Sequence, residues 1–220
     1  MDFYWIGLVL VSALLHPLRD LILKGTAQPM LSYAGVSVVW VVLAGFHAIT
    51  TGQDLSLQKE IWPFVATSVL GLSLYYYGTL SALRRGNLSV YYPIIRSSPI
   101  AIVVFSWLAM DRSYSWLTIA GIFTVLLGSF MIQKTPGSVL EDQKAFGLAI
   151  IAMLGSAAYS ISDAGAMQFT TPAVYLFYTN ISVTVLLLGI QRWESRLNTL
   201  SFGEVAQQWL RVPWRIMLAG

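Results

Sequence analysis

The stretch SVYYPIIRSSPIAIVVFSWLAM, residues 89–110, is an almost unbroken apolar run that contains a single charged residue, Arg96, between Pro93 and Pro99. A helix of this length crosses the hydrocarbon core of a bilayer, which is about 30 Å thick. An arginine near the centre of such a span costs about 2.5 to 3.5 kcal/mol on insertion scales, so it needs a partner or a water-filled cavity. The stretch therefore predicts a membrane helix in which Arg96 has a specific task.

Composition extends this prediction to the whole chain. Of its 220 residues, 56% are hydrophobic and 10% are charged, whereas soluble domains contain about 25% charged residues. The formal charge of +3 is spread over short connectors, which argues against nucleic acid as a partner. The absence of cysteine excludes disulfides, thiolate metal sites and cysteine nucleophiles. We expect an integral, multi-pass protein of a cell membrane, bacterial inner or plasma membrane, with the lipid bilayer as its solvent.

Apolar windows predict a polytopic membrane helix bundle of the all-α class. In lipid, backbone N–H and C=O groups must be satisfied within each segment, which favours helices. The connectors between the windows are short and polar. About seven spans and the start of an eighth are expected, near residues 3–23, 30–49, 61–83, 88–110, 115–133, 145–167, 172–191 and from 213 onward.

An internal repeat is visible at an offset of 143 residues, which places Asp20 on Asp163 and His16 on Tyr159. Because five helices precede the linker, the second unit is inverted relative to the first, an arrangement from which many transporters build alternating access. The predicted division is a five-helix repeat over 1–133, a polar linker over 134–144 and an incomplete inverted repeat over 145–220.

Three segments resemble the EamA branch of the drug/metabolite transporter superfamily: SALLHPLRDLILKG, SAAYSISDAGAM and LSVYYPIIRSSPIAIVVFSWLAMDRSYSWLTIAGIFTVLLGSFMI. The last is the most specific, with a Y-P-x-x-R-x-x-P helix, Asp111 where the family more often has glutamate, and a glycine-rich helix. The resemblance implies a ten-helix bundle of two inverted repeats that moves small organic solutes, often outward. We expect no cofactor. It also leads us to expect that roughly three helices of the second repeat are missing, so that the chain is a fragment or works with helices in trans, as in a homo-oligomer.

Arg96 has two readings from the sequence. On a helix it shares a face with Tyr92 and both prolines. In one reading it donates to carbonyls freed by the prolines, or pairs with a carboxylate, and stabilises a kinked helix. In the other, its planar guanidinium faces a central cavity and binds an anionic group of the solute.

Polar stripes on the first and sixth spans supply the other candidates. His16 and Asp20 lie on one face of the first span, and Tyr159 and Asp163 lie on the matching face of the sixth. A packing role for His16, a local ion pair for Asp20 and proton coupling at His16 or Asp163 stay open, as does pairing of Asp163 with Arg96. The predicted substrate-binding residues are Arg96, Tyr92, Asp163, Tyr159, His16 and Asp20.

Other polar and small residues have simpler explanations. The tyrosines at 75–77, with Tyr175, Tyr178 and Asn180, could line a path, but aromatic packing explains them equally well. Gly121, Thr124 and Gly128 place small residues on one face of the fifth span, which allows close helix contact and needs no functional explanation.

Function classes other than transport fit less well. The only histidines are His16 and His47, and no H-E-x-x-H or paired-carboxylate motif is present, so we expect no enzyme activity. The alternatives to a metabolite or drug exporter are a non-transporting membrane scaffold or partner subunit, and a lipid-linked sugar flippase.

Connector charges predict an orientation. The odd-numbered connectors contain eight Lys and Arg residues and the even-numbered ones two, so the positive-inside rule favours an external N-terminus. The resemblance implies the reverse, with both termini cytoplasmic, and we follow the charges because they belong to this sequence.

Overall fold

The computed structural model describes residues 29–85, 88–131, 142–194, 202–211 and 213–219, with isolated positions before residue 29. Within these residues every regular element is a helix, so the predicted all-α membrane bundle is confirmed. Most of the predicted first span and of the predicted linker lie outside the described residues.

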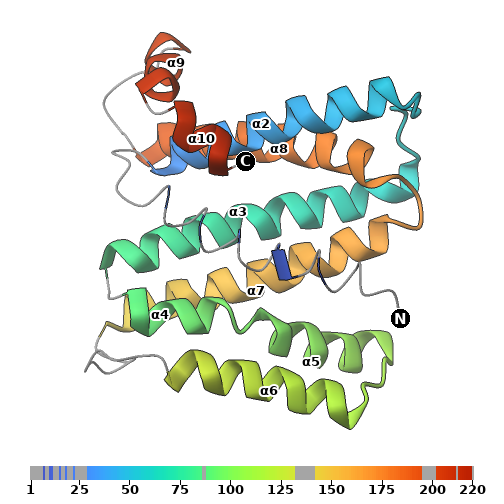
Figure 1. The fold of residues 1–220 in the computed structure, drawn as a ribbon, viewed down its shortest axis with the longest axis vertical. Helices are drawn as coiled ribbons and strands as arrows, with labels where there is room; N and C mark the ends of the chain where they lie inside the picture. The colour runs from blue at the N-terminus through green and yellow to red at the C-terminus, as the bar shows by residue number, and fades with distance from the viewer. Residues whose placement is uncertain are drawn as a thin grey trace. The chain divides into compact units, whose positions relative to one another are not determined.

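The described helices match most of the predicted spans to within a few residues (Figure 1). They are α2 (Pro29–Thr50), the short 3₁₀ helix η1 (Lys59–Ile61), α3 (Trp62–Arg85), α4 (Leu88–Ile95), α5 (Ser98–Met110), α6 (Trp116–Met131), α7 (Gln143–Ala166), α8 (Pro172–Glu194), α9 (Phe202–Arg211) and α10 (Pro213–Ala219).

Four segments of the described chain are long and apolar enough to cross a membrane: Met30–Thr50, Val90–Met110, Gln143–Ala166 and Pro172–Trp193. The helix α3 has the length but is less apolar, because serines, threonines and tyrosines occupy the face that it buries. Polarity that would be costly toward lipid is instead placed toward other helices. The helix α3 thus buries its polar face, while Leu70 and Leu74 on its other side are exposed.

Two compact units make up the chain: a central unit, residues 56–175, and a terminal unit formed by residues 1–55 and 176–220. This division does not follow the predicted repeats, because compactness and inverted repetition are different properties. The repeat boundaries stay a prediction.

In the central unit α3 and α7 pack side by side over most of their length (Figure 1). Their backbones touch: a Cβ atom on Gly78 would lie 2.7 Å from the Leu148 carbonyl oxygen, and one on Gly71 would lie 2.8 Å from that of Gly155. Residue numbers rise along α3 as they fall along α7, so the two helices are antiparallel. Small residues permit this approach, which strengthens van der Waals packing in a membrane.

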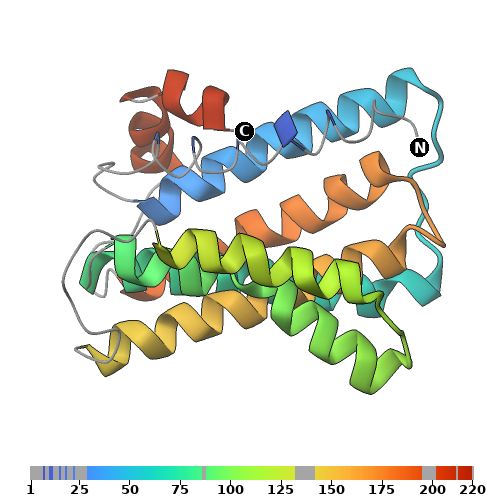
Figure 2. The ribbon, with the colours of Figure 1, turned by 60° about the horizontal axis from the view of Figure 1, so that its bottom comes forward.

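The remaining helices of the central unit surround this pair less tightly. Both α4 and α5 contact α7, and in Figure 2 α6 runs back toward α4, the helix that it contacts. The small residues of the fifth span, which would allow close helix contact, are not used for it within the described residues: a Cβ on Gly121 or Gly128 would meet nothing within 4 Å. Close approach occurs instead between α3 and α7, where glycines of each helix face backbone atoms of the other.

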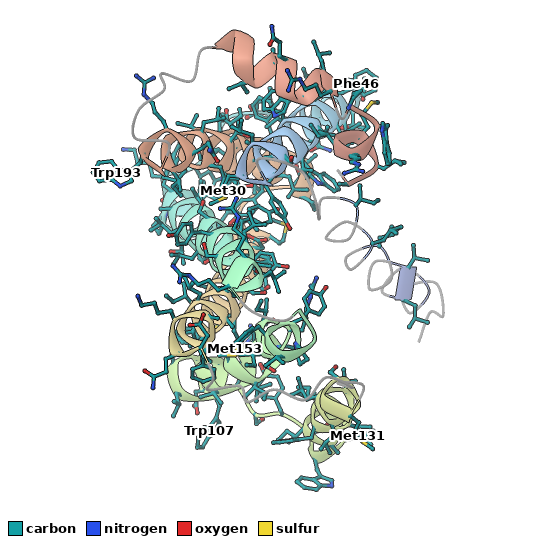
Figure 3. The ribbon with its side chains drawn as sticks, turned by 90° about the vertical axis from the view of Figure 1, so that its left-hand side faces the viewer. Met30, Phe46, Trp107, Met131, Met153 and Trp193 are labelled. Carbon is teal, nitrogen blue, oxygen red and sulfur yellow. The ribbon has the colours of Figure 1, made fainter. Side chains whose placement is uncertain are left out.

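Large apolar side chains cover the outside of α5 and α6. Trp107 is 64% exposed and Met131 is 82% exposed, and Figure 3 shows both projecting away from the unit. On α6, Leu126 is the buried large apolar residue among those described. Such all-round apolar exposure is expected of helices whose solvent is lipid.

In the terminal unit α2 packs against α9 and α10. The Trp209 indole Nε1 donates to the Leu31 carbonyl oxygen at 2.7 Å, and Ile216 lies against Gly35. The helix α9 was not predicted, because its apolar residues alternate with glutamate, glutamines and arginine and are too few for a span. An amphipathic spacing of three and four residues was the available signal.

Candidate functional site

The membrane segment around Arg96 is broken rather than merely kinked. The helix α4 ends at Ile95 and α5 begins at Ser98, so a turn of two residues interrupts the predicted span over 88–110, which remains long and apolar enough to cross a membrane. The Ser97 N–H donates to the Ile94 carbonyl oxygen at 3.0 Å, and the Ser97 hydroxyl donates to that of Pro93 at 2.7 Å. The flanking prolines cause the break, since neither has an N–H for the helical ladder.

Arg96 lies in this break and is held by Tyr92. Its Nη2 donates to the Tyr92 hydroxyl oxygen at 2.7 Å, and its Cζ lies 4.9 Å from the centroid of the Tyr92 ring. Both side chains are partly exposed. The ring therefore fixes the orientation of the guanidinium through a hydrogen bond and a cation–π contact.

Asp163 belongs to a second polar group, at the other end of the central unit. Its Oδ1 accepts a hydrogen bond of 2.6 Å from the Ser68 hydroxyl of α3. The Tyr175 hydroxyl of α8 lies close to Asp163 and Ser68, and it donates to the Phe64 carbonyl oxygen at 3.2 Å. We call Ser68, Asp163 and Tyr175 the polar triad.

The sequence left pairing of Asp163 with Arg96 open; in the structure the Asp163 carboxylate accepts from the Ser68 hydroxyl instead. Arg96 lies beside the first part of α7, whereas Asp163 lies near the end of that helix. The Tyr91 hydroxyl of α4 lies 3.4 Å from the Asp142 carbonyl oxygen, which places α4 beside the start of α7. Asp163 is about 30 Å farther along α7 than Asp142, at 1.5 Å per residue.

An apolar cluster adjoins the polar triad. Ile61, Val65, Ala166 and Tyr175 pack together and are almost completely buried. Beside them the rings of Phe64 and Phe169 lie 5.7 Å apart. Tyr175 belongs to both groups, so its ring closes the apolar cluster while its hydroxyl completes the triad.

The other predicted residues divide between packing and regions that are not described. The Tyr159 ring lies 6.0 Å from that of the buried Tyr75, in the seam between α7 and α3. Tyr178 donates to the Leu55 carbonyl oxygen, and Asn180 to a carbonyl of its own helix, so both have structural partners. His16 and Asp20 lie outside the described residues.

Sequence reasoning missed Ser68 and Ser97. Each is a common residue whose importance depends on a partner, the Asp163 carboxylate for one and the Pro93 carbonyl for the other. The contact between Ser97 and the Pro93 carbonyl could have been predicted, because Ser97 follows Pro93 by one helical turn. The first required knowledge that α3 packs against α7.

The sequence model of the EamA-like transporter family matches residues 2–133, more than half of the chain. The chain belongs to the EamA-like transporter family. The matched part contains α2 to α6 and with them Arg96 and Tyr92, whereas the polar triad extends beyond it through Asp163 and Tyr175. No curated protein and no solved structure matches the chain.

Membership of the EamA-like transporter family defines the general function. It identifies the chain as an integral membrane protein of a family that transports small solutes and is not enzymatic. The apolar outer faces of α5 and α6 agree with a lipid surrounding.

Proposed function

We propose that this EamA-like protein carries a small organic solute with an anionic group across a cell membrane by alternating access, opening first to one side and then to the other. In this proposal Arg96 and Tyr92 contact the solute. Export is the direction that the family resemblance implies. The proposal is supported by family membership and by the arrangement around Arg96.

The observation that carries the proposal is the coincidence of a helix break with an intramembrane arginine. Non-helical backbone is tolerated at membrane depth where it is buried in protein or lines a water-filled cavity. The break here is buried at Ile95 and Ser97, while Arg96 between them is partly exposed. Transporters build solute sites at such interruptions, because backbone and side-chain groups can face the ligand there.

The chemistry of Arg96 suits a carboxylate or phosphate. A guanidinium presents several N–H donors in a planar fork, which matches the two oxygens of an anionic group. Tyr92 orients this fork through the 2.7 Å hydrogen bond and the ring contact. In the proposed carrier, Tyr92 is a positioning residue that also offers its ring face to the solute.

The proposed site explains where movement is expected. The backbone contact between α3 and α7 at Gly71 and Gly78 leaves little room for sliding, so this pair moves as one body. At the break the Arg96 N–H keeps a helical hydrogen bond to the Tyr92 carbonyl oxygen, whereas the Ser97 N–H turns to the Ile94 carbonyl oxygen, and in the proposed carrier this turn is where α4 and α5 change their relative direction.

Flux through proteoliposomes tests the proposal. Vesicles containing the wild type, Arg96→Lys, Tyr92→Phe or the control Arg112→Lys are loaded with radiolabelled organic acids, amino acids, organic phosphates and neutral sugars. Arg112 is exposed in the connector after α5 and lies outside the proposed site.

We expect the wild type and Arg112→Lys to transport one anionic class, and Arg96→Lys to lose at least tenfold in rate because an ammonium cannot bind two oxygens side by side. Tyr92→Phe should raise the solute concentration for half-maximal rate. Preference for neutral sugars, or an unaffected Arg96→Lys, would contradict the site. Absence of any flux would favour the scaffold role.

A further inference from the structure

The polar triad is a group of polar residues in the central unit that the proposed solute site does not use. Three helices contribute to it: α3 through Ser68, α7 through Asp163 and α8 through Tyr175. Ser68 is 2% exposed and Tyr175 is 1% exposed, so the hydroxyl groups are sealed inside the protein. Asp163 is half-buried near the end of the candidate span Gln143–Ala166.

A structural role alone explains this group poorly. The α3–α7 seam is already closed by backbone contact at Gly71, Gly78 and Gly155, and the apolar cluster around Ile61 and Val65 closes the end. An ionisable group in a membrane span costs free energy of insertion, so such a group usually has a function. None of the basic residues that the structure describes is a partner of Asp163, whose polar neighbours are hydroxyl groups.

The ligands assembled here are all oxygens. Besides the Asp163 carboxylate and the hydroxyls of Ser68 and Tyr175, the Phe64 carbonyl lies within reach of the Tyr175 hydroxyl at 3.2 Å. A carboxylate can take up a proton, and carboxylate, hydroxyl and carbonyl oxygens together suit a hard cation. From α8, Tyr175 is the titratable group that faces Asp163. Among the described residues of α3, only Ser68 and Phe64 face it, and neither is charged. Arg96, at the α4–α5 break, contacts Tyr92 instead.

We propose that Asp163, assisted by Ser68 and Tyr175, binds the monovalent cation, H⁺ or Na⁺, whose gradient drives the carrier. This rests on the proposed transport function. Cation binding replaces the Ser68 hydrogen bond or shares its oxygen, which changes how the ends of α3, α7 and α8 are held together. Solute binding at Arg96, between α4 and α5, and cation binding at Asp163, on α7, are then separate events in one carrier.

The test separates driven accumulation from exchange. Proteoliposomes with an anionic solute that the wild type carries are assayed for uphill accumulation under a pH gradient, under a Na⁺ gradient, and for one-to-one exchange without either gradient. The variants are Asp163→Asn, which still accepts from Ser68, and Asp142→Asn. Asp142 caps the start of the same helix by accepting from the N–H groups of Lys144 and Ala145, and asparagine caps equally well.

For one coupled ion, a tenfold gradient supports about tenfold accumulation at equilibrium. We expect the wild type and Asp142→Asn to reach a clear accumulation with one of the two gradients, which identifies the ion. Asp163→Asn should keep exchange within about twofold while accumulation falls to near unity. Ser68→Ala should keep accumulation but need a several-fold higher cation concentration for half-maximal rate.

Several results would overturn the coupling site. Accumulation by Asp163→Asn equal to that of the wild type would overturn it. Loss of both exchange and accumulation in a folded Asp163→Asn variant would also overturn it, because Asp163 would then belong to the solute path. Exchange by the wild type with accumulation under neither gradient would leave the carrier function intact and refute coupling.

A binding measurement keeps the inference testable if the wild type transports nothing or Asp163→Asn does not insert. Thermal unfolding of purified protein in detergent is followed against Na⁺ concentration, with K⁺ at constant ionic strength, and against pH. A ligand that binds the folded state raises the unfolding temperature. We expect a shift that Asp142→Asn keeps and that Ser68→Ala and Asp163→Asn weaken; an identical shift in all of them would refute the site.

Discussion

Gly71 of α3 and Gly155 of α7 bring the backbones of the two helices into direct contact: a Cβ atom on Gly155 would lie 2.6 Å from the carbonyl oxygen of Gly71. No side chain separates the helices at this point. The buried Tyr75 and the ring of Tyr159 lie beside the contact and fill the space around it. This contact is the packing on which the central unit depends.

The first prediction concerns this contact. Gly155→Ala should destabilise the protein by about 1 to 3 kcal/mol, because the added methyl group meets backbone atoms that cannot move aside. Gly147→Ala on the same helix is the matched control, since a Cβ there would meet nothing within 4 Å. Thermal unfolding in detergent measures both. Equal unfolding temperatures for the two variants would show that the seam is looser than described.

A second prediction concerns the broken helix. Ser97→Ala removes the hydroxyl that donates to the Pro93 carbonyl oxygen at 2.7 Å in a buried setting, and should cost about 1 kcal/mol. Ser129→Ala removes a similar hydrogen bond, to the Val125 carbonyl oxygen, at an exposed position and should cost far less. Chemical unfolding of the two variants decides, and a larger loss for Ser129→Ala would contradict this role of Ser97.

A third prediction concerns the contact between α9 and α2. Trp209→Phe keeps an aromatic ring but loses the indole N–H that donates to the Leu31 carbonyl oxygen. Amide hydrogen exchange along α9 should accelerate several-fold, because a net hydrogen bond contributes about 1 kcal/mol. Trp214→Phe, at a 56% exposed position on α10, is the control and should leave exchange in α9 unchanged.

Much of the fold could be predicted from the sequence because membrane spans have a strong signal. Apolar runs of the right length gave α2, α6, α7 and α8 to within a few residues. The signal failed at α9, whose amphipathic pattern is short. The apolar signal also did not predict the break between Ile95 and Ser98. Prolines predict a weakened helix, but they do not predict that the Ser97 hydroxyl donates to the Pro93 carbonyl oxygen.

The candidate site was less predictable than the fold. Arg96 and Tyr92 were predicted because one is a charge in an apolar run and the other lies one turn away, and their role in the site stays a prediction. The partner of Asp163 could not be assigned from the sequence: charge complementarity offered Arg96 as one alternative, whereas the packing of α3 on α7 supplies Ser68. A single sequence contains the residues of a contact between distant helices but not their register.

Membrane orientation gives a fourth prediction. The native chain has no cysteine, so single cysteines report on single connectors. From the connector charges, Ser113→Cys after α5 should react with an impermeant thiol reagent added outside intact cells, and Gly86→Cys, which lies outside the described residues, should not. The opposite pattern would favour the orientation that the family resemblance implies, with both termini cytoplasmic.

The central claim, that Arg96 binds the solute, is tested most directly by one paired measurement on Arg96→Ala. Thermal stability in detergent, with and without an anionic solute that the wild type carries, and flux in proteoliposomes are taken from the same preparation, with Arg112→Ala as control. We predict that Arg96→Ala unfolds close to the wild-type temperature, transports nothing and gains no stability from the solute, whereas the wild type and Arg112→Ala are stabilised by it. A collapse of stability in Arg96→Ala, with flux reduced only in proportion to the folded protein, would contradict the claim and show that Arg96 holds the broken helix together.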